Sequence, residues 1–189
     1  MADENLTGKR VLAVVSNYGV EQDELFVPVR ELLAAGAEVD VAAVSSGIVQ
    51  TLVGDKDPGE SLTPALTVAQ ADHSNYDLLL LPGGTLNADA LRLDDDAVEL
   101  VRAFTSAGST VAAICHGPWA LVEAAVVKGK RLTSYPSLAT DIRNAGGDWV
   151  DEEAATDSSG GWTLITSRTP DDLDAFVREM RTALVTATD

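Results

Sequence analysis

Short apolar runs alternate along this chain with longer segments in which apolar residues recur at helical spacing. This alternation is typical of a mostly parallel sheet that is covered by helices on both faces. A chain of 189 residues is long enough for one such unit, so we predict a single doubly wound α/β domain over residues 1–189. The expected strands are residues 11–15, 39–44, 78–81 and 110–114, with short strands at Leu132, Trp149 and Leu164, the last two of which are expected to pair.

Helices are expected between these strands. The last helix has a clear start, because Thr169 suits the N-cap and Pro170 the first helical position. Residues 45–76 combine Gly54, Pro58 and acidic residues, which indicates a hairpin or an excursion outside the main sheet. The expected helices are residues 22–35, 94–108, 117–126, 136–145 and 170 onward, the last with Leu173, Phe176, Val177, Met180 and Leu184 as its core face.

Acidic residues outnumber basic ones, 30 Asp and Glu against 13 Lys and Arg, which gives a formal net charge of -17. Binding to phosphate groups needs an excess of Lys and Arg, so we expect no nucleic-acid partner and no membrane surface as a partner. A charge of this size destabilises a compact fold unless the solvent screens it. We therefore predict a halophilic protein from a high-salt cytoplasm.

Cys115 is the one cysteine of the chain, which excludes an internal disulfide. Two histidines, His73 and His116, give poor support for a zinc site, so no metal is expected. The N-terminus lacks the basic and apolar regions of a signal peptide, which predicts a cytoplasmic protein. Residues 103–122 carry no charged side chain, but Gly117-Pro118 and several polar residues fit a buried strand running into a helix better than a membrane span.

Three groups of reactive or turn-forming residues follow predicted strands, at residues 17–24, 82–84 and 115–117. In an open parallel sheet, ligands bind in the crevice beyond the carboxyl ends of the strands, so these groups are expected to meet there. Cys115 lies where a strand passes into a helix, which is the arrangement of a nucleophile elbow. We expect the helix N-terminus to lower the thiol pKa and to provide a thiolate at neutral pH.

A lone cysteine is more often a small buried apolar residue than a nucleophile. The strand end and the adjacent His116 favour the nucleophile here, although His116 must turn back to reach the sulfur. Gly83 and Gly84 form either a simple tight turn or an oxyanion hole made of backbone N–H groups. Glu21 and Glu24 face the same crevice, Glu21 as a pocket residue. A glutamate buried beside the sulfur is expected to be protonated and to donate a hydrogen bond to it.

The segment Ala-Ile-Cys-His-Gly-Pro-Trp-Ala-Leu at residues 113–121 resembles the ThiJ/PfpI superfamily, closest to its PfpI branch. The similarity covers nearly the whole chain and includes residues 19–25, 81–84, 87–92, 133–136 and 166–173. The resemblance implies a flavodoxin-like three-layer sandwich with a nucleophile elbow. In it, Cys115 would be the nucleophile, His116 the adjacent base and Glu24 the protonated acid beside the sulfur.

The resemblance also implies what surrounds these residues. The backbone N–H groups of Gly84 and His116 match the oxyanion hole, and Tyr135 matches a tyrosine that lines the substrate pocket. Asp89 matches an acid that a neighbouring subunit supplies as the third triad member, so a homo-oligomer, a dimer or higher, is expected. Two departures from the family pattern are visible. Asp89 is shorter than the glutamate often found there, and residues 54–57 read Gly-Asp-Lys-Asp in place of Gly-Lys-His-Gly.

The function implied by the resemblance is a cofactor-free cysteine enzyme in which the Cys115 thiolate attacks a carbonyl group. Its substrate would be a peptide, or a small carbonyl compound of the methylglyoxal type in a glyoxalase or deglycase reaction. The alternative is a redox-sensing stress protein or holdase chaperone, whose Cys115 is oxidised to a sulfinate held by Glu24. A glutamine amidotransferase is less favoured, because the chain has one plausible catalytic histidine and no synthetase domain.

Overall fold

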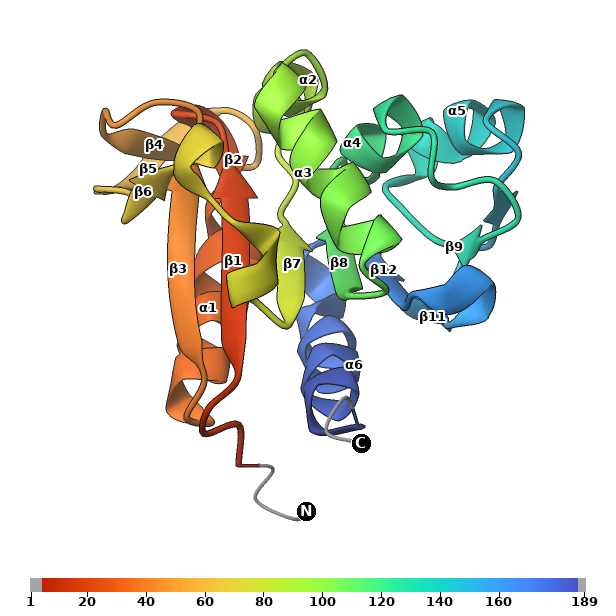
Figure 1. The fold of residues 1–189 in the computed structure, drawn as a ribbon. Coiled ribbons are helices and arrows are strands. Elements are labelled where there is room, and N and C mark those ends of the chain that lie inside the picture. Colours follow the sequence, from red (N-terminus) through yellow and green to blue (C-terminus); the bar gives the residue numbers. More distant parts are fainter. Residues whose placement is uncertain (1–4, 187–189) are drawn as a thin grey trace.

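A computed structural model describes residues 5–186 of the protein, and a large β-sheet lies at its centre (Figure 1). In spatial order its strands are β11 (Ala154–Asp157), β12 (Leu164–Ser167), β8 (Thr110–Ile114), β7 (Leu78–Leu81), β1 (Arg10–Val15), β3 (Glu38–Ala43) and β6 (Leu66–Thr67). Neighbouring strands pair in parallel, except that β11 runs antiparallel to β12. The mostly parallel sheet expected from the apolar runs is confirmed.

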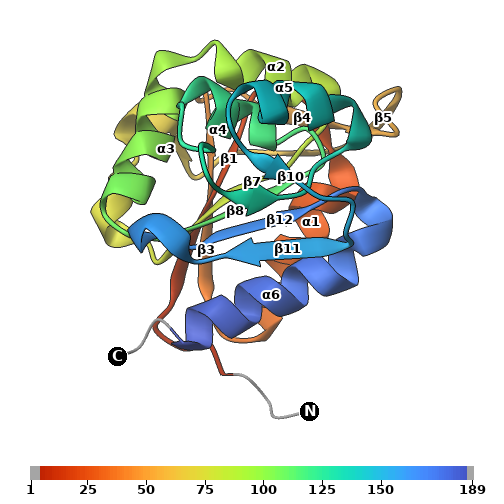
Figure 2. The ribbon, with the colours of Figure 1, turned by 90° about the vertical axis from the view of Figure 1, so that its right-hand side faces the viewer.

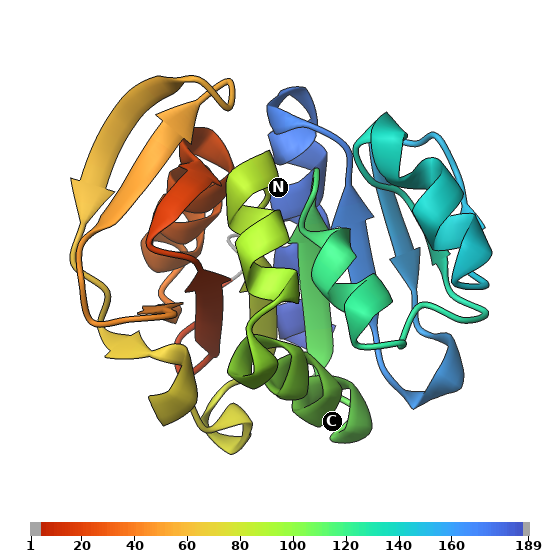
Figure 3. The ribbon, with the colours of Figure 1, turned by 90° about the horizontal axis from the view of Figure 1, so that it is seen from above.

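Helices cover both faces of this sheet, so the fold has three layers. One face carries α1 (Gln22–Ala34) and α6 (Leu173–Thr186), and the other carries α3 (Asp95–Ser106) and α4 (Pro118–Glu123), as Figure 2 and Figure 3 show. Successive side chains of a strand point to opposite faces. In β7, Leu79 therefore packs in the core cluster of Phe104, and Leu80 packs in the cluster of Phe176. The core face expected for the last helix is confirmed.

A smaller sheet lies beside the central one. Its strands are β2 (Tyr18–Glu21), β4 (Val49–Val53) and β5 (Asp57–Leu62). β4 and β5 form an antiparallel hairpin, and β2 pairs in parallel with β4, so the hairpin expected within residues 45–76 is confirmed. Leu66–Thr67 of the same stretch instead joins the central sheet as β6. Because β2 leads directly into α1, the smaller sheet holds the β4–β5 loop beside the carboxyl end of β1.

Two short strands at the other end of the molecule correct the sequence-based pairing. β9 (Arg131–Leu132) pairs with β10 (Asp148–Trp149), whereas the strand of Leu164 pairs with β8 and β11. Trp149 and Leu164 are therefore not on paired strands. The expected helix at residues 136–145 is a 3-10 turn, η3 (Pro136–Leu138), followed by α5 (Ala139–Asn144).

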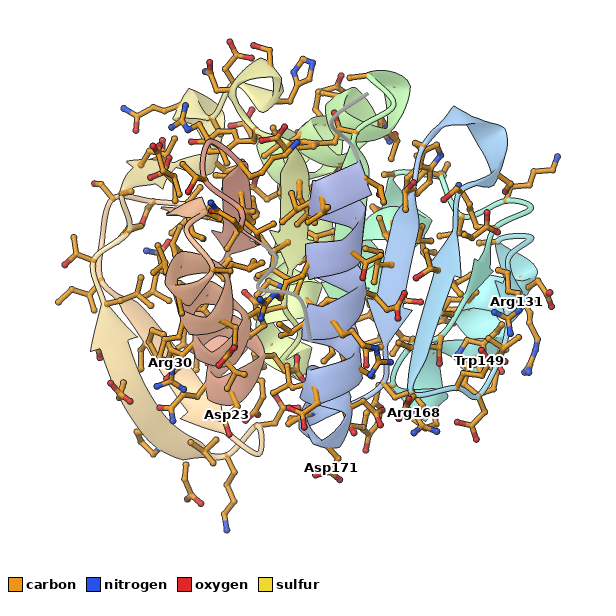
Figure 4. All side chains as sticks on the ribbon, turned by 90° about the horizontal axis from the view of Figure 1, so that it is seen from below. Asp23, Arg30, Arg131, Trp149, Arg168 and Asp171 are labelled. Atoms are coloured by element: carbon orange, nitrogen blue, oxygen red, sulfur yellow. The ribbon has the colours of Figure 1, made fainter. Side chains whose placement is uncertain are left out.

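One additional helix and one early helix end differ from the sequence-based expectation. The chain forms α2 (Thr85–Arg92), which was not predicted, because its exposed Leu86 and Ala90 give no clear apolar stripe. α4 ends early, since Ala125 adopts a left-handed conformation with φ +60°. The start of the last helix is as expected: Thr169 is the N-cap residue and Pro170 the first position of the 3-10 turn η5 (Pro170–Asp172), which leads into α6, although Thr169 makes no side-chain capping bond. Figure 4 labels Asp171 in this turn and Arg168 just before it.

The remaining short 3-10 turns are η1 (Val68–Gln70), η2 (His73–Asn75) and η4 (Ser159–Gly161). Within residues 5–186, no helix combines the length and the apolar character needed to cross a membrane. The uncharged residues 103–122 form the end of α3, all of β8 and most of α4, as expected. Residues 1–4, on which the prediction of the compartment mainly rests, lie outside the described residues.

Candidate active site

The carboxyl ends of β1, β7 and β8 meet at one edge of the central sheet, which Figure 3 views from above. The buried side chain of Asn87, on α2, ties two of these ends together. Its Oδ1 accepts a hydrogen bond from the N–H of Ser16 at 2.7 Å, and its Nδ2 donates to the carbonyls of Pro82 and Gly83 at 3.1 and 3.0 Å. Asn87 fixes the Gly-Gly turn against β1, a role that sequence analysis missed.

Cys115 occupies a tight turn directly after β8. Its φ is +61°, a left-handed conformation that is uncommon for residues other than glycine and is often found at functional sites. The backbone holds this turn from both sides: the N–H of Cys115 donates to Ser167 at 3.1 Å, and its carbonyl accepts from the N–H of Tyr135 at 2.8 Å. This conformation is the one expected of a nucleophile elbow.

Glu24 projects from α1 to the sulfur of Cys115. Its side chain is fully buried, and its Oε2 accepts a hydrogen bond of 2.7 Å from the N–H of Gly83. Burial raises the pKa of Glu24 to about 8, against the lowering effects of its hydrogen bonds with Cys115 and Gly83, so this carboxyl carries a proton at neutral pH.

Gly83 is the residue that makes this close approach feasible. A Cβ atom there would lie 2.5 Å from Glu24 Oε2, 2.7 Å from Cys115 Cβ and 2.9 Å from the backbone nitrogen of His116. Any side chain at this position would therefore separate the acid from the sulfur or displace the elbow.

The thiol itself corrects the sequence-based expectation. Burial raises the pKa of Cys115, and Glu24, once it has lost its own proton, raises it further through its charge and hydrogen bond; the backbone N–H groups of Gly84 and His116 oppose these effects but do not outweigh them. Sequence analysis predicted a lowered pKa because it could not show that the side chain is only 7% exposed. The sulfur at rest is therefore a thiol, which needs a base to become a nucleophile.

His116 supplies a nitrogen at the right place for such a base. Its ring turns back over the elbow, so that Nδ1 lies 3.1 Å from the sulfur of Cys115. Tyr135 stacks on the ring at 4.6 Å between centroids, and Trp119 meets it edge-on at 5.3 Å. Burial lowers the pKa of His116, so the ring is neutral at neutral pH and can accept a proton.

The other predicted site residues are more scattered. Tyr135 is 40% exposed and covers His116 from the solvent side. Glu21 is buried, and its two carboxylate oxygens accept the N–H groups of Gly54 and Asp55, each at 3.2 Å. Its structural task is thus to hold the β4–β5 loop, and its role toward a substrate stays a prediction.

Asp89 lies on the exposed side of α2, so its proposed service to a second chain also stays a prediction. Within the described residues, the carboxylate whose charge acts on His116 is that of Asp55. Sequence analysis noted Asp55 as a departure from the family pattern; its backbone has a left-handed φ of +57°, and its N–H is held by Glu21. In the described part of the chain, no group of three or more His, Cys, Asp or Glu side chains is placed to hold a metal ion.

The chain is similar to known proteins along almost its full length. The model of the DJ-1/PfpI family matches residues 9–183. General stress protein 18 of Bacillus subtilis is 38% identical over 172 residues, which are 91% of this chain and 95% of the relative. Protein/nucleic acid deglycase 2 of Escherichia coli is 39% identical over 169 residues, 89% of this chain and 94% of the relative.

The solved structures lead to the same family. The crystal structure of Drosophila melanogaster DJ-1beta superposes with a TM-score of 0.82 at 30% identity, covering 94% of this chain and 90% of that one. With an elbow cysteine followed by histidine and with close relatives along almost its full length, the chain belongs to the DJ-1/PfpI family.

Proposed function

We propose that this protein is a cysteine-dependent enzyme that acts on small carbonyl compounds of the methylglyoxal type or on their adducts. The observation that carries the proposal is the 3.1 Å contact between the Cys115 sulfur and Nδ1 of His116. A neutral imidazole at hydrogen-bond distance can activate a thiol as a nucleophile, because this base can take the thiol proton as the sulfur attacks.

The burial of this pair favours small substrates over polypeptides. Cys115 is 7% exposed and His116 is 6% exposed. A small aldehyde can reach such a sulfur through a narrow opening, whereas a peptide bond in a chain would need an open groove. The name of the Escherichia coli relative, protein/nucleic acid deglycase 2, supports the other part of the proposal, which concerns adducts.

The first chemical step follows from the positions of these atoms. The thiol proton passes to Nδ1 of His116 while the sulfur forms a bond to the aldehyde carbon, and the carbonyl π pair moves to oxygen. Backbone N–H groups of Gly84 and His116 face the sulfur and would stabilise the developing oxyanion. The oxygen then takes the proton from the imidazolium, which gives a hemithioacetal and restores neutral His116.

In the glyoxalase reaction, the hemithioacetal next isomerises. A base, His116 or the ionised form of Glu24, would remove the proton from the carbon that bears sulfur and return it to the neighbouring carbonyl carbon, through an enediol. The result is a 2-hydroxy thioester, and water then hydrolyses it to the hydroxy acid and the free thiol. In a peptidase reaction, His116 would instead protonate the leaving amine.

A redox-sensing stress protein or holdase is the second candidate. A neutral Glu24 beside the sulfur can donate a hydrogen bond to an oxidised form of Cys115, and the name of General stress protein 18 is consistent with such a role. This candidate needs no turnover.

The deciding experiment compares wild type with Cys115→Ala and His116→Ala for turnover of methylglyoxal, of a methylglyoxal adduct and of casein. We expect methylglyoxal or adduct turnover, its abolition in Cys115→Ala, and a loss of about 10²–10⁴-fold in His116→Ala. Turnover that survives in Cys115→Ala would contradict the proposal. No turnover by wild type, with protection against aggregation intact in Cys115→Ala, would favour the holdase.

The oligomeric state remains part of the proposal. Leu86, Asp89 and Ala90 lie along the exposed side of α2, and Leu86 and Ala90 line an open, mainly apolar hollow with Tyr18 and Val44. None of the residues that line this hollow is Cys115, His116 or Glu24. If a homodimer covers this hollow, analytical ultracentrifugation should give a molar mass twice that of the 19.8 kDa chain.

A further inference from the structure

We infer that Thr85 and Asp55 are positioning residues that hold His116 in a single tautomer, with a proton on Nε2 and a free lone pair on Nδ1 facing Cys115. The catalytic consequence of this inference rests on the proposed function, but the hydrogen-bond chain itself does not. Neither residue was among the candidates from the sequence, and Asp55 occupies a position where the family pattern has a basic residue.

The geometry begins at the first residue of α2. The hydroxyl of Thr85 lies 2.6 Å from Oδ2 of Asp55, and the backbone N–H of Thr85 donates to Oδ1 of the same carboxylate at 2.8 Å. On its other side, the hydroxyl oxygen lies 3.5 Å from Nε2 of His116. Thr85 thus bridges the loop carboxylate and the ring, with a longer contact on the side of the ring.

The direction of these bonds follows from counting hydrogens. A threonine hydroxyl has one hydrogen, and an ionised carboxylate can only accept, so the Thr85 hydrogen points to Asp55. Toward His116 the same oxygen can then only accept, which requires a hydrogen on Nε2. A neutral imidazole has one N–H, so Nδ1 is unprotonated and accepts from the Cys115 thiol at 3.1 Å.

The loop that carries Asp55 is itself fixed. Both oxygens of the buried Glu21 carboxylate bind loop N–H groups, one of them that of Asp55 at 3.2 Å. Glu21 lies at the start of α1, one turn before Glu24, so the same strand-to-helix junction places the acid beside the sulfur and anchors the acid beyond the ring.

The hydrogen bonds from Asp55 through Thr85 also stabilise the His116 ring after the ring takes the thiol proton. The imidazolium keeps its Nε2–H toward Thr85, and the Asp55 carboxylate lies one hydroxyl further on. Burial is the larger effect and lowers the pKa of His116, while the charge of Asp55 raises it. The other titratable groups around the ring are Cys115 and the stacked Tyr135, with Glu24 beyond the sulfur.

Nuclear magnetic resonance can read the tautomer without any substrate. The chain has two histidines, so ring-¹⁵N-labelled full-length protein gives two sets of signals, and His73→Gln assigns them. We expect His116 of wild type at pH 7 to carry its proton on Nε2, Thr85→Ser to keep this state, and Thr85→Val and Asp55→Ala to give a mixture of tautomers. Thr105→Val is the matched control, because it removes a threonine hydroxyl of α3 that donates to Arg102 of its own helix.

A second measurement follows the rate at which iodoacetamide alkylates Cys115 as a function of pH. Thr85→Val should slow alkylation at pH 7 by about tenfold or more, because a misplaced tautomer removes the base from the sulfur, and Thr85→Ser should restore the rate. Thermal melting of each variant checks its fold.

The outcomes separate the two claims. An Nδ1–H tautomer in wild type, or an unchanged tautomer in folded Thr85→Val, overturns the assignment. So does loss of the Nε2–H signal in Asp89→Asn but not in Asp55→Ala, since the acid would then come from the second chain. If wild type turns over none of the tested substrates while the tautomer behaves as expected, the proposed function fails and the positioning role stands.

Discussion

Glu24 and Asp55 are two acids that act on the same Cys115–His116 pair, and the fold holds them by opposite means. Glu24 is fully buried on α1, within the main three-layer fold, and desolvation keeps it protonated. Asp55 is exposed at the tip of the smaller sheet and is held by backbone hydrogen bonds to Glu21 and by Thr85. Packing thus sets the acid beside the sulfur, whereas hydrogen bonds of a surface loop set the acid beyond the ring.

The largest expected effect of this difference is on the pH dependence of stability. The folded-state pKa of Glu24 is raised from 4.5 to about 8, so its favourable contribution is complete below pH 4.5 and is lost as the pH rises to about 8. Over that window the free energy of unfolding should fall with a slope of up to about 1.4 kcal/mol per pH unit. Glu24→Gln should remove this slope.

Urea denaturation at several pH values between these limits measures the effect. Glu31→Gln, which changes an exposed acid on the same helix, is the control and should keep the wild-type slope. Parallel stability curves for wild type and Glu24→Gln would show that Glu24 is ionised in the folded protein and would remove the contrast with Asp55.

A somewhat smaller loss of stability is expected from Gly83→Ala. The new methyl group would meet Glu24, Cys115 and the backbone of His116 at 2.5–2.9 Å, and overpacking of this kind costs about 1–3 kcal/mol. Gly47→Ala is the matched control, because its nearest neighbour would be an ordinary 3.5 Å from the new atom. Thermal melting should show a clear drop for the first variant only. An equal melting temperature for both would mean that the elbow can shift, and that Glu24 is less tightly fixed than its packing indicates.

The contrast between the two acids also explains what the sequence could predict. The strands, the elbow at Cys115 and the position of Glu24 follow from local signals, since apolar runs define strands and their ends meet at one edge of a parallel sheet. Asp55 and Thr85 come together through the register of a second sheet and the unpredicted helix α2, and no local pattern encodes either.

Two further failures have related causes. The thiol pKa depends on how deeply Cys115 is buried, which the sequence does not reveal. The pairing of Trp149 with Leu164 failed because short strands take their partners from packing between distant segments rather than from their own composition.

A third prediction uses salt to separate the two acids. Asp55→Asn keeps an oxygen for the Thr85 hydroxyl but removes the charge, so alkylation of Cys115 should slow by only a few-fold at low salt. In molar potassium chloride this difference should shrink, because the screening length falls from about 10 Å at 0.1 M to about 3 Å at 1 M. The effect of Glu24→Gln should be the same at both salt concentrations, since Glu24 is buried and uncharged at neutral pH.

Asp57→Asn, at the other side of the loop, is the control. A salt-independent effect of Asp55→Asn would mean that Asp55 acts through hydrogen bonds alone.

The smallest expected effect concerns the whole surface, of which the Asp55 loop is one part. A net charge of -17 on 189 residues leaves many exposed acids on the surface, among them Asp23 and Asp171, which Figure 4 labels, and their mutual repulsion weakens the folded state unless salt screens it. Raising potassium chloride from low to molar concentration should therefore raise the melting temperature, by about 2–4 °C for each 1 kcal/mol gained in the free energy of unfolding.

The melting temperature of the double variant Asp23→Asn, Asp171→Asn should rise less than that of wild type, because this variant has less repulsion to relieve. That of Glu24→Gln should rise as much as that of wild type. Equal melting of wild type in both solutions would remove the high-salt interpretation, and it would leave the contrast between the buried and the exposed acid to be decided by the site alone.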